Sequence, residues 1–247
     1  MRIFVEQNHV FEESGLIVIY DKELINHMIK SLRMKENDIL EVSDTNNLYE
    51  CKIEKISNDS INLIILGKIN NKGELNSYIA LFQGMTKSTK FDLIIQKNVE
   101  MGISEIIPVE MKRSITKIYD DKIEKKINRY QKIALEASMQ SYRQIVPNIS
   151  EIIKFDDILL KLKTFDIVLL AYENEKNVKL KNIFNKIENQ MKIAVIIGPE
   201  GGIDDSEIKY LKDNLKEKLY IISLGDRILR TETAGFYLLA QLNYILD

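Results

Sequence analysis

The first 70 or so residues of the chain consist of short apolar runs that alternate with polar turn signals. Ile, Leu and Val dominate the runs, whereas Asn, Asp, Ser and Lys dominate the segments between them, a pattern typical of β-strands. Three such strands at a spacing of about ten residues predict a small antiparallel barrel or sandwich. The expected strands are 39–42, 48–56 and 60–68, after an apolar start at 1–5 and an expected helix at 26–33.

The pattern changes at Tyr78, after a polar segment at 70–77 that we interpret as a linker. From there, apolar runs alternate with amphipathic stretches, which predicts βαβ units and a mostly parallel sheet covered on both faces. We therefore expect a β domain at 1–72 and an α/β domain at 76–247. The expected strands are 79–83, 105–110 with an interruption at Pro108, 166–171, 192–197 and 219–224; the expected helices are 90–101, 122–142, 156–163, 179–188, 204–215 and 233–246.

Composition narrows the classes of function. A single cysteine, Cys51, excludes an internal disulfide and a cysteine-based metal cage, and with only two histidines we expect no metal site. The net charge of −2 argues against a wholly basic nucleic-acid binder, although Lys and Arg outnumber Asp and Glu by twelve to eight between Met85 and Val146. That excess fits a phosphate-binding surface or solvated helix faces equally well. With no secretory signal and no apolar run of about 18 residues, we expect a cytoplasmic protein without membrane contact.

A glycine-rich segment, Gly198-Pro199-Glu200-Gly201-Gly202, directly follows the apolar run 194–197. Its glycines let the backbone approach a ligand closely or adopt a positive φ. Asp204 and Glu207 are suited to a capping box at the start of the next helix. The segment has neither the GxGxxG spacing of a dinucleotide site nor the Gly-Lys-Ser/Thr of a P-loop. Taken alone, it fits a tight turn and a ligand-binding loop equally well.

A second unusual segment, Leu224–Ala234, leads from an apolar strand into the last helix. Two arginines, two threonines and a glutamate lie within it, and backbone amides at a helix start can bind anionic groups. An ordinary capped helix with an Arg–Glu pair explains it equally well. In a parallel sheet both segments would lie at the carboxyl ends of strands, where such sheets bind ligands.

Taken together, the two segments resemble the RsmE family of 16S ribosomal RNA methyltransferases in the SPOUT superfamily. The resemblance covers essentially the whole chain. Stronger matches are Gln83-Gly84, Lys87–Lys97, Glu100–Gly102, Ile107-Pro108, Arg113-Ser114 and Arg129–Ala137, and weaker ones are Met1-Arg2, His27, Leu32-Arg33 and Asn37-Asp38. One departure is Met139, where the family usually has an acidic residue.

The resemblance implies a PUA-like, RNA-binding β-barrel followed by a SPOUT-type α/β domain with a C-terminal trefoil knot. It also implies a homodimer that acts on 16S rRNA or the small ribosomal subunit. The implied reaction transfers a methyl group from S-adenosylmethionine to N3 of a uridine (uracil-1498) in the decoding region, during ribosome maturation.

The resemblance also implies roles for individual residues. Glu232 is the candidate base for the uridine N3 proton, and Arg143 the candidate cation that faces the developing charge. Arg2, Arg33, Lys35 and Arg113 are candidate RNA contacts, although solvated surface charge explains each of them equally well. The expected cofactor-binding residues are Ala171, Gly198, Pro199, Glu200, Gly201, Gly202, Leu224, Gly225, Ile228, Leu229, Arg230, Thr231, Thr233 and Ala234.

Three alternatives stay open at this point. The chain could be a SPOUT enzyme that acts on tRNA or on a ribose 2′-hydroxyl, or an RNA-binding assembly factor that kept the fold without catalysis. Intact cofactor loops argue against the assembly factor. A nicotinamide dehydrogenase is disfavoured because the early GxGxxG turn and the ribose-binding acid are missing.

Overall fold

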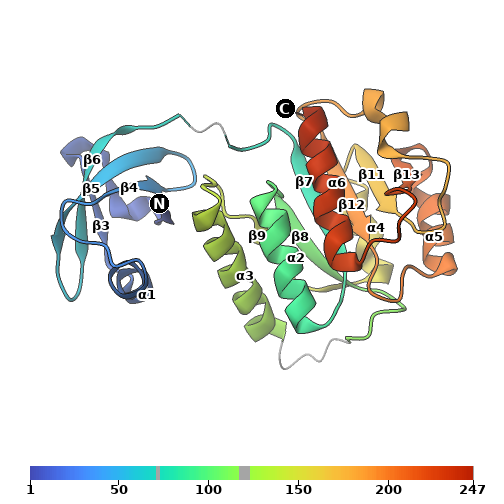
Figure 1. The fold of residues 1–247 in the computed structure, drawn as a ribbon, viewed down its shortest axis with the longest axis horizontal. Helices are drawn as coiled ribbons and strands as arrows, with labels where there is room; N and C mark the ends of the chain where they lie inside the picture. Colours follow the sequence, from blue (N-terminus) through green and yellow to red (C-terminus); the bar gives the residue numbers. More distant parts are fainter. Residues whose placement is uncertain (71–72, 117–122, 247) are drawn as a thin grey trace. The chain divides into compact units, whose positions relative to one another are not determined.

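The structure, a computed structural model, describes residues 1–70, 73–116 and 123–246. The chain divides into two compact units (Figure 1). The N-terminal unit comprises Met1–Glu74 together with Ser138–Val146, and the C-terminal unit comprises Leu75–Ala137 and Pro147–Asp247. The second boundary thus falls inside one long helix. The domain limits expected from the sequence, 1–72 and 76–247, stay a prediction.

The N-terminal unit is built around one sheet of six strands in the order β1-β4-β5-β6-β3-β2. β1 is parallel to β4, and every other pair in this order is antiparallel. Ile3, Ile17, Val42 and Ile53 are fully buried and contribute to the core. The elements are β1 (Arg2–Phe4), β2 (Val10–Phe11), β3 (Leu16–Ile19), α1 (Lys22–Asn26) with a further helical turn at His27–Ser31, β4 (Ile39–Ser43), β5 (Leu48–Ile56) and β6 (Ile61–Lys68).

The strands expected at 39–42, 48–56 and 60–68 are confirmed as β4, β5 and β6. The hairpin of β2 and β3 was missed, because β2 is only two residues long and β3 is a continuous apolar run without alternation. The helix expected at 26–33 begins earlier, at Lys22, because the carboxylate of Asp21 caps it by accepting the amide of Leu24 at 2.9 Å.

The C-terminal unit contains a parallel sheet in the order β10-β8-β7-β12-β11-β13, with β9 also paired to β8. Its strands are β7 (Tyr78–Gly84), β8 (Glu105–Glu110), β9 (Asn148–Ile149), β10 (Ile153–Lys154), β11 (Ile167–Ala171), β12 (Lys192–Ile197) and β13 (Leu219–Ile222). Its helices are α2 (Ser88–Glu100), α3 (Ile123–Gln140), α4 (Ile158–Leu162), α5 (Asp205–Leu215) and α6 (Thr231–Leu246).

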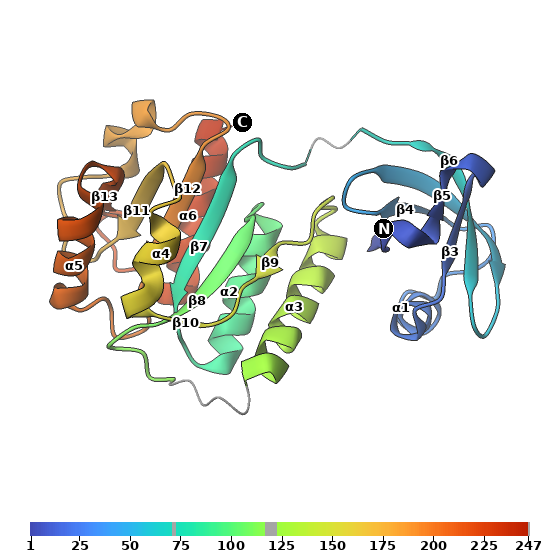
Figure 2. The ribbon, with the colours of Figure 1, turned by 180° about the vertical axis from the view of Figure 1, so that it is seen from behind.

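Helices cover both faces of this sheet, as the alternating pattern predicted. α2, α3 and α6 lie on one face, and α4 and α5 lie on the other (Figures 1 and 2). On the second face, Ile208, Leu211 and Leu215 of α5 pack into a core cluster with strand residues such as Phe82 and Ile196. Their spacing of three and four residues is the stripe expected of a helix that buries one side.

The helix expected at 179–188 is wrong. The segment contains only two short 3₁₀ turns, at Leu180–Asn182 and Phe184–Lys186. Lys179 instead forms an isolated parallel bridge with Ser223, and its amide donates to the side-chain oxygen of Asn182 at 2.8 Å. That bond caps the first turn, but Ile183 between the two turns has a φ of −125°, outside the helical region, so the turns do not join into one helix.

The interruption expected at Pro108 is also wrong, because β8 continues through it. The carbonyl of Val109 accepts the amide of Met85 from the β7 side, so strand alternation turns the nitrogen of Pro108 to the opposite side. There β9 ends opposite Ile106 and β10 begins opposite Val109, and Pro108 lies between the two. A residue without an N–H is tolerated at such a gap.

β9 and β10 themselves were not predicted from the sequence. Lys122, the expected start of α3, lies outside the described residues.

Candidate active site

A cavity of about 520 Å³ lies at the carboxyl ends of β11, β12 and β13. These strands are parallel, and β11 pairs with both of the others, so the loops that follow all three meet at one edge. The volume is within the range of small-molecule sites, roughly 300–1,000 Å³. All of the expected cofactor-binding residues except Thr233 line the cavity: Ala171, Gly198, Pro199, Glu200, Gly201, Gly202, Leu224, Gly225, Ile228, Leu229, Arg230, Thr231 and Ala234.

Two glycines of the loop after β12 occupy positions that a larger residue would not fit. Gly202 has a φ of +72°, a backbone conformation that residues with a Cβ rarely adopt. A Cβ on Gly198 would lie 2.7 Å from the side chain of Ile203. The loop is therefore packed tightly against its surroundings, and its backbone forms one wall of the cavity.

A buried polar centre joins this loop to the start of α6. The hydroxyl of Thr231 donates to the carbonyl oxygen of Gly198 at 2.6 Å, and the side-chain amide of Gln83 donates to that hydroxyl at 3.0 Å. Gln83 is fully buried near the end of β7, and the same amide nitrogen also donates to the carbonyl of Gly84 at 3.1 Å. Three segments that are distant in the sequence are thus held together beside the cavity.

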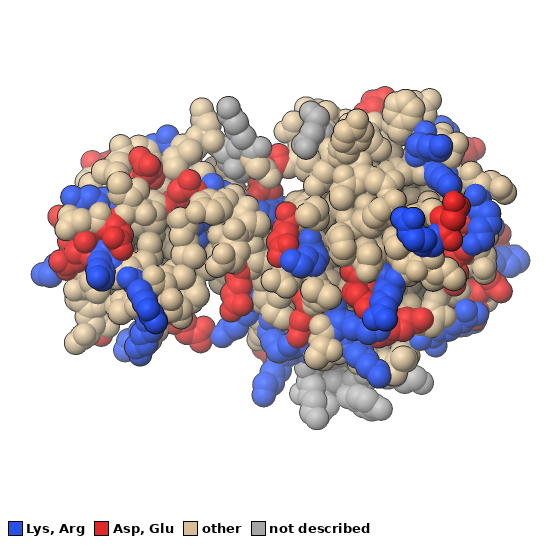
Figure 3. Space-filling view, in the orientation of Figure 1, with Lys and Arg blue, Asp and Glu red and all other residues tan. Residues whose placement is uncertain are grey.

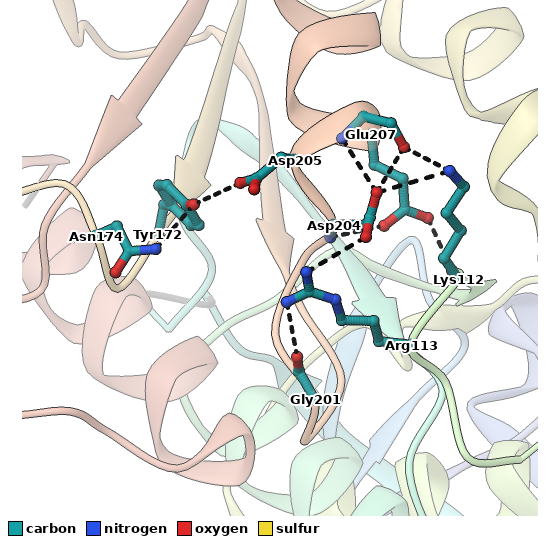
Figure 4. Close-up of polar contacts among 9 residues, drawn as sticks. Lys112, Arg113, Tyr172, Asn174, Gly201, Asp204, Asp205 and Glu207 are labelled. Atoms are coloured by element: carbon teal, nitrogen blue, oxygen red, sulfur yellow. Dashed lines mark hydrogen bonds and ion pairs between the residues drawn. The ribbon is translucent and has the colours of Figure 1, made fainter.

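The first turn of α5 fixes the other end of the glycine-rich loop. The expected capping box is confirmed: Asp204 caps α5, and its own amide donates to Glu207 at 3.1 Å. Arg113 reaches from the segment after β8 and donates to the carbonyl of Gly201 and to Asp204, each at 3.3 Å (Figure 4). Hydrogen bonds from Ser206, with Lys112 and Arg113 nearby, lower the pKa of Asp204 to about 2.

Charged side chains from three segments gather on one wall of the cavity. Glu232, in the first turn of α6, and Glu200 each have a carboxylate oxygen, Oε2, that is buried without a hydrogen-bond partner among the described residues. The ammonium of Lys90, from α2, lies 3.4 Å from Oε1 of Glu200 and 3.9 Å from Oε2 of Glu232. Arg230 lies 3.8 Å from the other oxygen of Glu232, but its side chain is 82% exposed, so solvent screens this pair.

Arg143, the candidate catalytic cation, is not among the residues that line this cavity. It belongs to the N-terminal unit, where its side chain is 5% exposed and pairs with Glu74 at 2.6 Å. Glu74 also accepts the amides of Gln144 and Ile145 at 2.8 and 3.2 Å. In this chain the pair thus fixes the backbone that follows α3.

The four candidate RNA contacts differ in their surroundings. Arg33 and Lys35 are exposed, whereas Arg2 is buried and donates to one carboxylate oxygen of Glu41 at 2.9 and 2.7 Å and to the carbonyl of Tyr142. Arg113 is also exposed and lies beside the glycine-rich loop. Figure 3 shows Lys and Arg side chains at the lower end of the C-terminal unit, near the carboxyl ends of its strands, with Asp and Glu among them. Their contact with RNA stays a prediction.

Neither Lys90 nor Gln83 was expected in the site from the sequence, although both lie in segments that match the RsmE pattern. The missing information was the strand order, which puts β7 beside β12 and brings the start of α2 to the cavity. Among the described residues, no group of three or more His, Cys, Asp or Glu side chains could hold a metal ion. No helix in the described part of the chain is long and apolar enough to span a membrane.

Comparisons with known proteins agree with this architecture. Residues 73–243 match the family model of an RNA methyltransferase domain, and residues 19–66 match that of an RNA methyltransferase PUA domain. The chain is 32% identical to ribosomal RNA small subunit methyltransferase E of Bacillus subtilis over 98% of this chain and 96% of that protein. It is 36% identical to the protein of the same name from Mesomycoplasma hyopneumoniae, with 88% of this chain and 89% of that protein covered.

A solved structure supports the same assignment. Ribosomal RNA small subunit methyltransferase E of Neisseria gonorrhoeae, bound to S-adenosylmethionine, superimposes with a TM-score of 0.86. The two chains are 25% identical, and the superposition covers 99% of this chain and 97% of the other. With family models over both units and relatives matched along nearly their full length, the chain belongs to the ribosomal RNA small subunit methyltransferase E family, with a PUA-like domain before a SPOUT-type α/β domain.

Proposed function

We propose that the protein transfers a methyl group from S-adenosylmethionine to N3 of a uridine in the decoding region of 16S rRNA, uracil-1498. Family membership makes it an S-adenosylmethionine-dependent rRNA methyltransferase, and our proposal adds the nucleotide and the atom that are methylated. One observation carries this proposal: Oε2 of Glu232, which is buried and has no hydrogen-bond donor among the described residues, lies on the wall of the cavity that both loops line. A carboxylate placed there is suited to take a proton from a bound base.

The residues present fit this cofactor. The cavity has the volume of a small-molecule site, and backbone from Gly198 to Gly202 forms part of its wall. Glycines at these positions let main-chain donors and acceptors approach a nucleoside without intervening side chains. When bound, S-adenosylmethionine supplies an electrophilic methyl group on a sulfonium, so the protein needs no covalent nucleophile. We therefore assign the thirteen cavity-lining residues given above, together with Thr233, to cofactor binding.

The chain's own residues then have two tasks. The first is to hold the acceptor base in line with the methyl group, and such orientation is worth on the order of 7–11 kcal/mol in favourable cases. The second is to remove the N3 proton of uridine, because N3 attacks through the electron pair left by that proton. Glu232 is our candidate base, since its Oε2 is shielded from solvent and accepts no other hydrogen bond among the described residues.

The proposal is tested by mapping methylated uridine in 16S rRNA. Small subunits from cells that lack the gene are incubated with the purified protein and S-adenosylmethionine, and nuclease fragments are analysed by mass spectrometry. We expect N3-methyluridine at one position only. Methylation of a ribose hydroxyl, or of tRNA alone, would favour another SPOUT substrate, and binding of RNA without any methylation would favour an assembly factor.

Glu232→Gln tests the base, with Glu200→Gln as the matched variant on the same wall. We expect Glu232→Gln to lose about 100-fold or more in turnover while calorimetry shows that it still binds S-adenosylmethionine. Glu200→Gln should instead weaken the binding of S-adenosylmethionine, because Glu200 is among the residues assigned to the cofactor. At saturating cofactor it should keep most of its turnover, since Glu200 already interacts with Lys90 and with the amide of Lys87 at 3.5 Å. If Glu200→Gln abolished turnover and Glu232→Gln did not, the role assigned to Glu232 would be wrong.

We further propose the assembly that the resemblance implies: a cytoplasmic homodimer whose C-terminal unit contains a trefoil knot. In this proposal the β domain at 1–72 and the α/β domain at 76–247 both contribute to RNA binding, with phosphate contacts from Arg2, Arg33, Lys35 and Arg113, and Arg143 faces the charge that develops on uracil. Light scattering during size-exclusion chromatography tests the dimer, because a mass near 28.7 kDa would contradict it.

A further inference from the structure

The methyl-transfer site needs a cation close to the base, and the cavity offers four. Lys90, Lys176, Arg227 and Arg230 all line it. The last three are exposed, so water and salt screen their charges. Lys90 is the least exposed of the four, and its side chain is 34% accessible. Its charge therefore acts more strongly inside the cavity than that of the other three.

The position of Lys90 is fixed by the helix that carries it. It lies in the first turn of α2, whose Phe91 and Ile94 are buried in the core. Its ammonium lies between a carboxylate of the loop after β12 and one of the first turn of α6, at 3.4 Å from Glu200 and 3.9 Å from Glu232. The distance to Glu232 is too long for a hydrogen bond, and Oε2 of Glu232 accepts no hydrogen bond from any described residue. The ammonium thus lies close to the candidate base without being locked to it.

We propose that Lys90 is a catalytic residue whose ammonium pairs with Glu232 in the free protein and with a uracil carbonyl oxygen during the reaction. This role rests on the proposed function. The N3 proton moves to Oε2 of Glu232, which becomes neutral, while the negative charge moves to the uracil ring and its oxygens. N3 then forms a bond to the methyl carbon as the carbon–sulfur bond breaks, and its electron pair stays on sulfur. The proton leaves Glu232 for water after the transfer.

During the reaction the ammonium of Lys90 exchanges one anionic partner for another. Before proton transfer the ammonium interacts with a carboxylate, and afterwards that carboxylate is neutral and the anion is the base beside it. Lys90 therefore retains an anionic partner throughout, whereas a neutral residue in its place would leave the uracil anion unbalanced in a partly buried site. A flexible stem with a compact charge suits this small displacement, since lysine can follow the charge without a fixed fork geometry.

The test compares Lys90→Gln with Lys87→Gln, which removes the same charge one turn earlier. Lys87 is exposed and does not line the cavity. We expect Lys90→Gln to lower kcat about 100-fold, the usual effect of losing one group that stabilises developing charge. Its melting temperature and its Kd for S-adenosylmethionine should change little. Lys87→Gln should keep wild-type kcat, and Lys90→Arg should recover part of the loss because it restores the charge.

A second measurement separates charge stabilisation from simple positioning. RNA with 5-fluorouridine at the target loses its N3 proton more readily, because fluorine withdraws electrons from the ring. Its anion needs Lys90 less, so the loss caused by Lys90→Gln should shrink from about 100-fold to about tenfold. An equal loss on both RNAs, or a weaker Kd for S-adenosylmethionine with unchanged kcat, would overturn the proposal. A wild-type protein without turnover would overturn the proposed function and this role together, whereas an active Lys90→Gln variant overturns only the role of Lys90.

Discussion

The hydroxyl of Thr231 donates to the carbonyl oxygen of Gly198 at 2.6 Å, and this bond joins the first residue of α6 to the loop after β12. Gln83 donates to the same hydroxyl from the end of β7. The three residues are separated by more than thirty positions at each step, yet they share one polar centre beside the cavity. The shape of the cofactor site therefore depends on the hydrogen bonds of a single threonine.

Thr231→Val tests this dependence, because valine keeps the shape of threonine and removes the hydroxyl. The carbonyl of Gly198 loses its strongest donor and keeps the long bond from the amide of Gln83 at 3.4 Å, while that amide loses its acceptor on Thr231. We expect the free energy of unfolding to fall by about 1–3 kcal/mol, the usual cost of unsatisfied buried groups. Urea denaturation measures the fall, and calorimetry should show weaker binding of S-adenosylmethionine. Thr231→Ser keeps the hydroxyl and serves as the control, so an equal loss in both variants would contradict this explanation.

Gly84→Ala tests how closely the loop after β12 packs against the end of β7. A Cβ on Gly84 would lie 2.5 Å from both the nitrogen and Cδ of Pro199, so the loop must move. Overpacking of this kind costs about 1–3 kcal/mol, and we expect that loss in urea denaturation. Gly67→Ala is the matched control, because a Cβ there would have no atom within 4 Å. Equal stability of the two variants would show that the loop yields without cost.

Much of this fold was predictable because the apolar runs of the chain are its strands. The run Lys192–Ile197 was predicted with the bounds of β12, and Asp204 with Glu207 identified the start of α5. The pattern failed where the local backbone decides the structure, as at Ile183, whose φ of −125° separates two short 3₁₀ turns. The candidate site was predictable only in its two loops. Lys90 belongs to the site because β7 lies beside β12, which brings the start of α2 to the cavity. This strand order depends on contacts between residues far apart in the chain.

We expect the buried pair of Arg143 and Glu74 to stabilise the folded protein. In Glu74→Gln, the buried guanidinium loses the charge of Glu74, and breaking a buried pair in this way costs about 3–5 kcal/mol. We expect a loss at the lower end of that range, since the side chain of Glu74 is 18% exposed. Thermal denaturation measures it, with Glu13→Gln as the control at an exposed position. A loss no larger than that of the control would mean that the pair contributes little to folding.

We expect the stability that Asp204 gives to the start of α5 to depend on pH. Hydrogen bonds from Ser206 hold the pKa of Asp204 at about 2 in the folded protein, below its ordinary value of 3.8. Because folding lowers the pKa, the carboxylate stabilises the native state above about pH 4, and this contribution is lost as the pH falls towards 2. Asp204→Asn keeps an oxygen that can cap the helix but removes the charge.

We therefore expect Asp204→Asn to unfold at lower urea concentration than the wild type at pH 7, with a difference that shrinks between pH 4 and pH 2. Asp213→Asn is the control, because it removes an exposed carboxylate of the same helix away from the cap. A difference for Asp204→Asn that stayed constant down to pH 2 would mean that the shape of the cap, and not its charge, holds the start of α5. Since Arg113 joins Asp204 to Gly201, a charge effect should also appear as weaker cofactor binding at neutral pH.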